Sequence, residues 1–312
     1  MDGTGFREPV HPVHPSNPVI LSKNSRHVAP AFPAFLSAGT RLDTNRRMLK
    51  LLFLGDIVGE PGRRAVIDVL PKWKEAWGLD FIVVNGENSA NGRGITPKIA
   101  VDLMRAGAAV ITTGDHIWDQ KEILPFLDNE PRLLRPINYP PGTPGGGSIV
   151  LETAKGKVAV VNVQCRTFMN PPLENPFLAM RDEVNRLREE TPIILVDCHG
   201  ETTSEKIAMG RYLDGRVSAV LGTHTHCQTA DEQIFPGGTA YLTDAGFCGP
   251  SESCLGRELG PIIQRFLTGR PILFPIASGP VGLRGALVEI DEETGRAVKI
   301  TRVVEEWVKP ET

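Results

Sequence analysis

The sequence predicts an α/β protein in which buried parallel strands alternate with helices and a C-terminal antiparallel hairpin is added. From Met48 onward, short apolar runs alternate with segments of helical periodicity, which is the pattern of parallel strands joined by helices. The last two apolar runs are separated only by the turn-forming residues 291–295, which indicates a hairpin. Several strands end in glycine followed by polar side chains, and ligands of open α/β sheets bind at such strand ends.

The individual elements follow from local signals in chain order. Leu49–Leu54 is apolar throughout and is predicted to be a buried strand. Pro61–Trp77 is predicted as a helix because proline is favoured in the first turn. Phe81–Asn85 is the next strand, and Thr96 is expected to cap a helix that ends at Arg105. The later strands are expected at Ala109–Thr113, Ser148–Leu151, Lys157–Val163, Ile193–Cys198, Val217–Leu221, Ala240–Thr243, Gly285–Ile290 and Ala297–Val303. The later helices are expected at Pro176–Arg188, Ser204–Tyr212 and Gly260–Leu267.

Residues 1–47 differ in composition from the rest of the chain. They contain six prolines, few periodic apolar positions and no strand pattern. Such a segment cannot bury enough apolar surface to offset the entropy lost on ordering. We therefore expect a disordered Pro-rich extension over residues 1–47 and a single domain over residues 48–312. In one interpretation Met48 is the true first residue and the extension is not native; a targeting peptide is the alternative.

Composition restricts the class of function. The 312 residues are 41% hydrophobic and 23% charged, as in a soluble globular protein. The net charge of −3 does not indicate stable nucleic-acid binding or a membrane surface, and no apolar run is long enough to span a membrane. Five cysteines without a C-x-x-C pair favour a reducing, cytoplasmic location. A small anionic substrate would need local positive charge, which metal ions can supply, and homo-oligomerisation is left open.

Polar side chains follow five of the predicted strands, as Asp56, Glu87-Asn88, Asp115-His116, His199 and His224-x-His226. Alone, each has a simpler explanation, since an aspartate after a strand is more often a turn or cap residue. The His224-x-His226 pair is more specific, because residues two apart in extended backbone face the same side. Oxygen and imidazole donors without thiolates suit Mn, Fe or Zn.

The order of these blocks resembles the calcineurin-like metallophosphoesterases, and within them the bacterial 2′,3′-cyclic nucleotide phosphodiesterases of the YmdB type. The resemblance covers residues 48–305. It is carried by the motifs GDIVGEPGR (55–63), VNGENSANGRGIT (84–96), TGDHIWD (113–119), HGETTSEK (199–206), GTHTHCQTAD (222–231) and TDAGFCGP (243–250).

The resemblance implies an α/β/β/α sandwich with mixed sheets and a site for two metal ions, Fe or Mn, at the C-terminal ends of strands. It implies that one ion is held by Asp56, Glu87, Asn88 and His226. It implies that the other is held by Glu87, Asp115, His199 and His224, with Glu87 bridging. His116 matches the proton donor to the leaving oxygen. The implied reaction is hydrolysis of phosphodiesters, with 2′,3′-cyclic nucleotides as the substrate class, by a metal-activated hydroxide.

Two departures from the family pattern affect this interpretation. Val58 stands where the superfamily has a histidine ligand, and Asn88 compensates, as is usual in this branch. Asp115 stands where the branch has asparagine, which adds a negative charge. A related phosphomonoesterase or nucleotidase is one alternative. A metal-holding regulatory protein with little turnover, in which Asp115 is a structural ligand, is another. Arg93 and Arg166 are candidate substrate contacts, with a structural role as the alternative.

Overall fold

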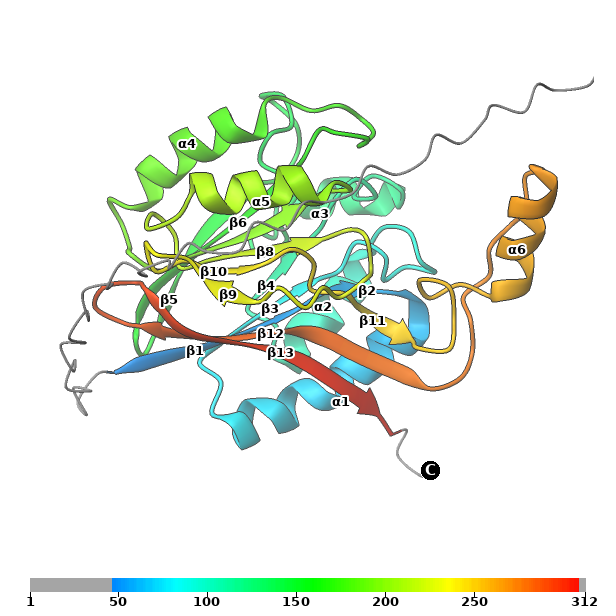
Figure 1. Ribbon diagram of the computed structural model, residues 1–312, viewed down its shortest axis with the longest axis horizontal. Coiled ribbons are helices and arrows are strands. Elements are labelled where there is room, and N and C mark those ends of the chain that lie inside the picture. Colours follow the sequence, from blue (N-terminus) through cyan, green and yellow to red (C-terminus); the bar gives the residue numbers. More distant parts are fainter. Residues whose placement is uncertain (1–46, 309–312) are drawn as a thin grey trace, which may run out of the picture. The chain divides into compact units, whose positions relative to one another are not determined.

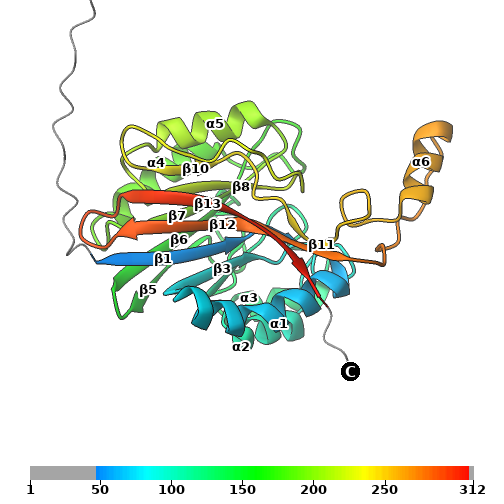
Figure 2. The ribbon, with the colours of Figure 1, turned by 60° about the horizontal axis from the view of Figure 1, so that its bottom comes forward.

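Two mixed β-sheets stack face to face in the computed structural model, which describes residues 47–308. Helices cover the outer face of each sheet (Figures 1 and 2). The predicted α/β/β/α sandwich with mixed sheets is therefore confirmed. The extension predicted over residues 1–47 lies, except for Arg47, outside the described residues.

The first sheet has seven strands and combines parallel and antiparallel pairs. Across the sheet the strands are β2 (Asp56–Ile57), β11 (Phe247–Pro250), β12 (Val281–Asp291), β1 (Met48–Leu54), β3 (Phe81–Asn85) and β4 (Val110–Thr112), with β13 (Ala297–Trp307) paired to β12. β1, β3 and β4 are parallel neighbours. β12 and β13 form the predicted antiparallel hairpin, and β12 joins it to this sheet by pairing antiparallel to β1.

The second sheet has six strands, of which the middle four are parallel. In order they are β5 (Ser148–Thr153), β6 (Gly156–Gln164), β7 (Ile194–His199), β8 (Ala219–Thr223), β10 (Ala240–Leu242) and β9 (Gln233–Ile234). The edge strands β5 and β9 pair antiparallel to their neighbours. The parallel strands of both sheets therefore place several carboxyl ends close to one another.

The cores explain why the strands are apolar on both faces. Leu51 and Phe53 of β1 share a buried cluster with Leu195 and Leu221 of the second sheet, whereas Leu52 belongs to the cluster under the outer helices. Strands covered on both faces lack the alternation of half-exposed strands. The helices of the first layer are α1 (Gly59–Trp77), α2 (Pro97–Ala106), the 3₁₀ turn η1 (Lys121–Ile123) and α3 (Leu124–Leu127). Those of the second are α4 (Pro176–Leu187) and α5 (Thr203–Tyr212).

Most predicted elements lie within two residues of their observed bounds. Thr96 caps α2 as predicted, because its Oγ1 accepts a hydrogen bond from the backbone N–H of Ile99 at 3.3 Å. The short strands β2, β9 and β11 and the segments η1 and α3 were not predicted, since two to four residues carry too little periodicity.

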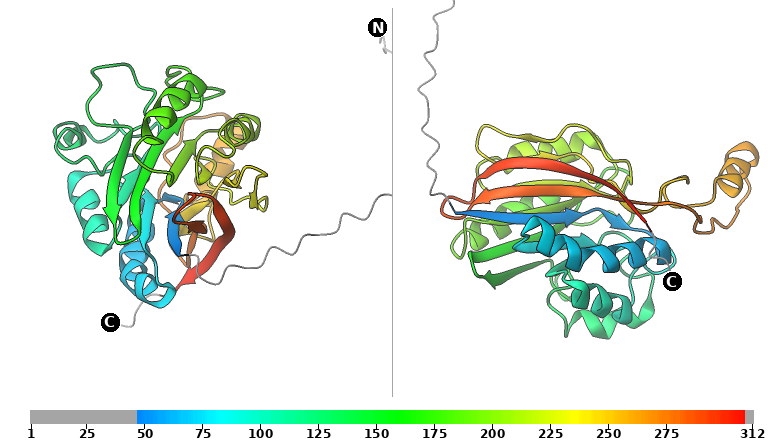
Figure 3. Two further views of the ribbon diagram at one scale, coloured as in Figure 1. Left: turned by 90° about the vertical axis from the view of Figure 1, so that its left-hand side faces the viewer. Right: turned by 90° about the horizontal axis from the view of Figure 1, so that it is seen from below.

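The last helix, α6 (Leu259–Thr268), stands clear of both sheets (Figure 3). It belongs to an excursion between β11 and β12, which we call the α6 arm and define as residues 255–276. At the base of the arm, Arg257 forms an isolated bridge with Ile276. No helix in the described part of the chain is both long and apolar enough to cross a bilayer.

Candidate metal centre

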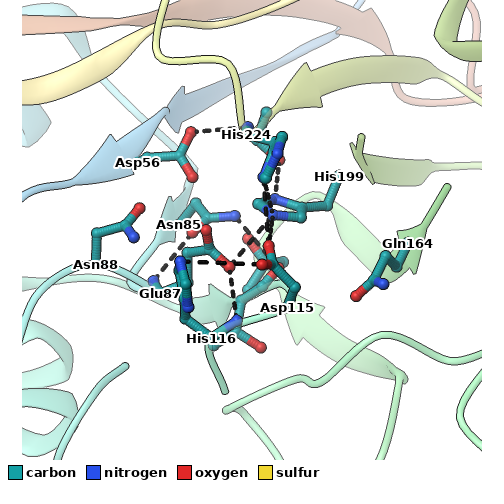
Figure 4. Close-up of polar contacts among 12 residues, drawn as sticks. Asp56, Asn85, Glu87, Asn88, Asp115, His116, Gln164, His199 and His224 are labelled. Atoms are coloured by element: carbon teal, nitrogen blue, oxygen red, sulfur yellow. Dashed lines mark hydrogen bonds and ion pairs between the residues drawn. The ribbon is translucent and has the colours of Figure 1, made fainter. Parts of the chain in front are cut away.

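The predicted strand-end residues converge on one site that lies between the two sheets. Asp56 follows β1 after one glycine, Glu87 lies two residues beyond β3, and Asp115 lies three residues beyond β4. From the second sheet come His199, the last residue of β7, and His224, which follows β8. Figure 4 shows these side chains directed toward a common centre. The strand ends therefore bring these polar side chains together, although they are far apart in the chain.

Four of these side chains form a tight cluster of metal-binding atoms. The donor atoms of Glu87, Asp115, His199 and His224 all lie within 4.8 Å of one another. His199 Nε2 is 3.3 Å from Glu87 Oε2 and 3.1 Å from Asp115 Oδ1. His224 Nδ1 is 3.3 Å from the same Asp115 oxygen. Two carboxylates and two imidazoles at this spacing can hold one divalent ion.

A second group of donors lies beside the first. His226 Nε2 is 3.0 Å from Asn88 Oδ1, and the backbone N–H of His224 donates to Asp56 Oδ2 at 3.1 Å. The other carboxylate oxygen of Asp56 is buried and has no hydrogen-bond partner in the described part of the chain. A buried acceptor without a partner is costly. This oxygen therefore fits a cation ligand.

The charges of the cluster favour cation binding. Burial raises the pKa of Asp56 well above its ordinary value. Burial also opposes the ionisation of Glu87 and Asp115, but hydrogen bonds and attraction from His199 outweigh it, with His224 adding to the effect at Asp115, so both pKa values lie below the ordinary range. The same carboxylates outweigh burial at His199 and raise its pKa. A divalent cation can replace the proton on His199 as the balancing charge.

A chain of hydrogen bonds orients His199 from behind. Its Nδ1 lies 2.9 Å from Thr223 Oγ1, which donates to Asp197 Oδ1 at 2.6 Å. The other oxygen of Asp197 accepts from Thr112 Oγ1 and Asn85 Nδ2. Asp197 is fully buried. The arrangement presents Nε2 to the site, as outer-shell partners of metal-binding histidines commonly do.

The loop that carries His224 and His226 does not follow strand geometry. Their φ values are 96° and 61°, so both lie in the left-handed region, and the prediction that extended backbone aligns them was wrong. Asp244 holds this loop, because it accepts hydrogen bonds from Thr225 N at 3.1 Å and Oγ1 at 2.8 Å. Lys206 pairs with Asp244 at 2.8 Å, and both side chains are buried. Backbone strain of this kind persists where surrounding contacts enforce it.

His116 lies at the site without joining the donor cluster. Its Nδ1 is 3.0 Å from Asp119 Oδ2, and its backbone N–H is 3.4 Å from Glu87 Oε2. Asp119 also accepts a hydrogen bond from Arg93 Nε at 2.7 Å. The sequence analysis did not assign this role to Asp119. The available signal was the i+3 spacing from His116 in a turn.

The candidate substrate contacts have different positions. Arg93 lines the open cavity of about 350 Å³ that also exposes Asn88, His116 and His226. Arg166 is exposed, its backbone N–H is bound to Glu205, and it is not among the residues lining this cavity. Arg257, which sequence reasoning did not identify, lines the cavity from the α6 arm. No motif in the sequence marks Arg257, because it reaches the site only through the tertiary fold.

Comparison with known proteins identifies relatives over most of the chain. The family model described as YmdB-like protein matches residues 52–303. A 2′,3′-cyclic-nucleotide 2′-phosphodiesterase of Bacillus subtilis (strain 168) is 48% identical over 256 residues, which are 82% of this chain and 97% of the relative. A crystal structure of a novel phosphatase from Mycoplasma pneumoniae has a TM-score of 0.79 and 34% identity, covering 85% of this chain and 96% of that one. A crystal structure of a hypothetical protein from Thermus thermophilus has a TM-score of 0.76 and 42% identity, covering 83% of this chain and 100% of that one.

Proposed function

The chain belongs to the YmdB-like protein family, and on this premise we propose that it is a two-metal phosphodiesterase that hydrolyses 2′,3′-cyclic nucleotides. The observation that carries the proposal is the cluster of two carboxylates and two imidazoles within 4.8 Å, with a non-clustered imidazole beside it. The activity named for the B. subtilis relative, which is 48% identical, supports the substrate class.

The residues present fit two cations. Glu87, Asp115, His199 and His224 would hold one ion, and Asp56, Glu87, Asn88 and His226 would hold the other, with Glu87 shared. The partnerless oxygen of Asp56 supports the second position. The mixed oxygen and nitrogen donors suit Mn or Fe. When bound, two such ions lower the pKa of water and withdraw charge from the phosphate oxygens.

The side chains around the ions supply the remaining chemistry. Water releases a proton to solvent to give hydroxide; as the hydroxide oxygen bonds to phosphorus, the bond from phosphorus to one ribose oxygen breaks, and that oxygen needs a proton. His116 donates this proton from Nε2, while Asp119, 3.0 Å from Nδ1, fixes the orientation of the ring. Arg93 and Arg257 line the same cavity and bind the phosphate through their guanidinium groups.

Activity assays with added Mn²⁺ test the proposal. We expect the purified chain to open adenosine 2′,3′-cyclic phosphate and to hydrolyse bis(p-nitrophenyl) phosphate, and to lose both activities in the presence of a chelator. The monoester p-nitrophenyl phosphate is expected to be a poorer substrate, because its second negative charge meets three carboxylates at the site. Turnover of the monoester alone would indicate a phosphomonoesterase. Full metal content without turnover of any substrate would indicate a metal-holding regulatory protein.

Asp115 offers a finer test, because it brings a carboxylate where the family branch has an amide. Its carboxylate accepts hydrogen bonds from two imidazoles of the cluster, and its negative charge opposes an incoming anion. We expect Asp115→Asn to raise kcat/KM for the diester by about tenfold, since a unit charge some 6 Å away at an effective dielectric of about 40 contributes ~1.4 kcal/mol.

The comparison of Asp115→Asn with the native chain is made at saturating Mn²⁺, where metal occupancy no longer limits the rate. Metal content is measured on both proteins. A variant that is fully loaded but slower than the native chain would contradict the electrostatic argument and make the Asp115 carboxylate a ligand that the site requires.

A further inference from the structure

A second cavity adjoins the metal centre at the base of the α6 arm. It has a volume of about 670 Å³ and shares two wall residues, Arg93 and Arg257, with the cavity over the metal-binding residues. Arg265 of α6 and residues 272–276 form the far wall. No aspartate or glutamate is among the described residues that line it. The second cavity, with basic walls, therefore borders the cavity over the metal-binding residues at Arg93 and Arg257.

Arg257 is built firmly into the boundary between the two cavities. Its guanidinium donates to the backbone carbonyls of Gly92 at 2.6 Å, Asn91 at 3.3 Å and Phe274 at 3.0 Å. A Cβ at position 92 would come within 2.2 Å of this guanidinium, and the φ of Gly92 is +85°. Glycine is therefore needed there, because it allows the loop to wrap closely around the arginine.

Two of the three arginines of this wall, Arg257 and Arg265, are not neutralised by an ion pair in the described part of the chain. Arg257 and Arg265 form no ion pair within residues 47–308, and Arg93 engages Asp119 through Nε alone. Burial, together with repulsion from Arg93, holds the pKa of Arg257 below its ordinary value. Backbone carbonyls satisfy hydrogen bonds but leave the net charge in place. The half-buried guanidinium of Arg257 and the exposed one of Arg265 are therefore both suited to bind a phosphate.

Apart from Asn91, the rest of the cavity wall is apolar. Residues 272–276 contribute isoleucine, leucine, phenylalanine and proline side chains, and Leu273 is 85% exposed. The guanidinium of Arg265 lies over the ring of Phe274, 5.6 Å from its centroid. An apolar wall beside a stacked arginine can accept the face of a nucleobase. The cavity thus combines the two elements that recognise a nucleotide, an anion site and a stacking surface.

We propose that the cavity at the base of the α6 arm binds the nucleotide on the 5′ side of the reacting one. The preferred substrates are then short oligoribonucleotides that end in a 2′,3′-cyclic phosphate, which can be extended only at the 5′ end. This inference rests on the proposed function and specifies its substrate class. Arg93 and Arg257 contact the reacting nucleotide, and Arg265 contacts the phosphate that joins it to the preceding one. The hydrolytic step is unchanged, because water opens the cyclic phosphate and the leaving ribose oxygen takes the proton.

Three substrates with the same base test this proposal. They are adenosine 2′,3′-cyclic phosphate, its 5′-phosphorylated form, and the dinucleotide ApA ending in a 2′,3′-cyclic phosphate. At saturating Mn²⁺, we expect kcat/KM of the native chain to be about tenfold or more higher for the two extended substrates. Arg265→Ala is expected to abolish this preference and leave the mononucleotide rate unchanged. Arg270→Ala, which removes an exposed arginine outside the cavity wall, is the matched control and should alter none of the three rates.

The outcomes separate the two proposals. Equal kcat/KM for all three substrates, or an equal loss on all three in Arg265→Ala, would overturn the subsite while leaving the phosphodiesterase intact. If no cyclic phosphate is hydrolysed, the proposed function fails, and calorimetry then decides the subsite. In that case the native chain must bind ApA with a 3′-phosphate more tightly than adenosine 3′-phosphate, and Arg265→Ala must bind the two ligands equally well. Equal affinities of the two ligands for the native chain would overturn the subsite.

Discussion

His224→Ala loses one metal ion per chain and nearly all diesterase activity; this is the largest effect that we expect. The imidazole supplies one of the four donors in the cluster and lies 3.1 Å from His199 Nε2 and 3.3 Å from Asp115 Oδ1. Loss of an outer-shell partner typically costs roughly 10–100-fold in metal affinity or activity, and loss of a direct ligand should exceed that range. Elemental analysis of the folded variant, together with kcat at saturating Mn²⁺, measures the effect.

Two further variants separate ligand loss from loop damage. His224→Gly removes the same imidazole but suits the backbone, because the φ of residue 224 is 96°. It should lose metal as His224→Ala does. Thr225 lies between the two histidines, and its hydroxyl donates a hydrogen bond to Asp244. The variant Thr225→Ala removes this hydroxyl and should keep both ions. Full metal content in either folded His224 variant would refute the assignment of His224 as a ligand.

His116→Ala is expected to keep both ions and to lose turnover by about 10²–10⁴-fold, which is the usual contribution of general acid–base catalysis. His116 lines the cavity and pairs with Asp119 at 3.0 Å, outside the four-donor cluster. The loss should be large for a ribose leaving group, which must be protonated. It should be much smaller for p-nitrophenolate, which departs readily as an anion.

The leaving-group comparison for His116→Ala is made on a cyclic nucleotide and on bis(p-nitrophenyl) phosphate, with metal content measured in parallel. Asp119→Asn is the matched variant, because it preserves a hydrogen-bonding group at the same place while removing the charge that faces the ring. The loss of turnover in Asp119→Asn should depend on the leaving group in the same way but should be smaller than in His116→Ala. A loss in His116→Ala that is equal on both substrates would argue against proton donation.

The sequence predicted the strands and the polar residues at their ends because both depend on local pattern. A buried parallel strand is continuously apolar, and its carboxyl end is where Asp56, Glu87 and His199 appear in the chain. The supporting contacts could not be predicted, since they depend on which elements become neighbours. Lys206 lies on a helix whose sequence has no pronounced apolar face, yet its side chain is fully buried against Asp244. Arg257 is 166 and 165 residues away from the two loop residues, 91 and 92, whose carbonyls it binds.

The same limit applies to backbone conformation. Spacing indicated that His224 and His226 share a site, and they contact Asp115 and Asn88 there. Periodicity assumes regular backbone, however, and both histidines lie in the left-handed region. The buried pair of Lys206, on α5, and Asp244, which follows β10, fixes that conformation. Sequence reasoning therefore found the histidines and carboxylates that lie together but not Asp119 or Arg257, and the fold determined how each of them is oriented.

The metal centre draws Asp56, Glu87 and Asp115 from the first sheet and His199 and His224 from the second. Ions held by both sets would add a link between two halves of the molecule that are also joined by apolar packing and by the hydrogen bonds from Asn85 and Thr112 to Asp197. A ligand that binds only the native state stabilises it by about 2.7 kcal/mol when present at 100 times its dissociation constant. Because cellular proteases remove chains that open transiently, the lifetime of this protein would rise and fall with the supply of its metal. The abundance of the protein would then report the metal status of the cell.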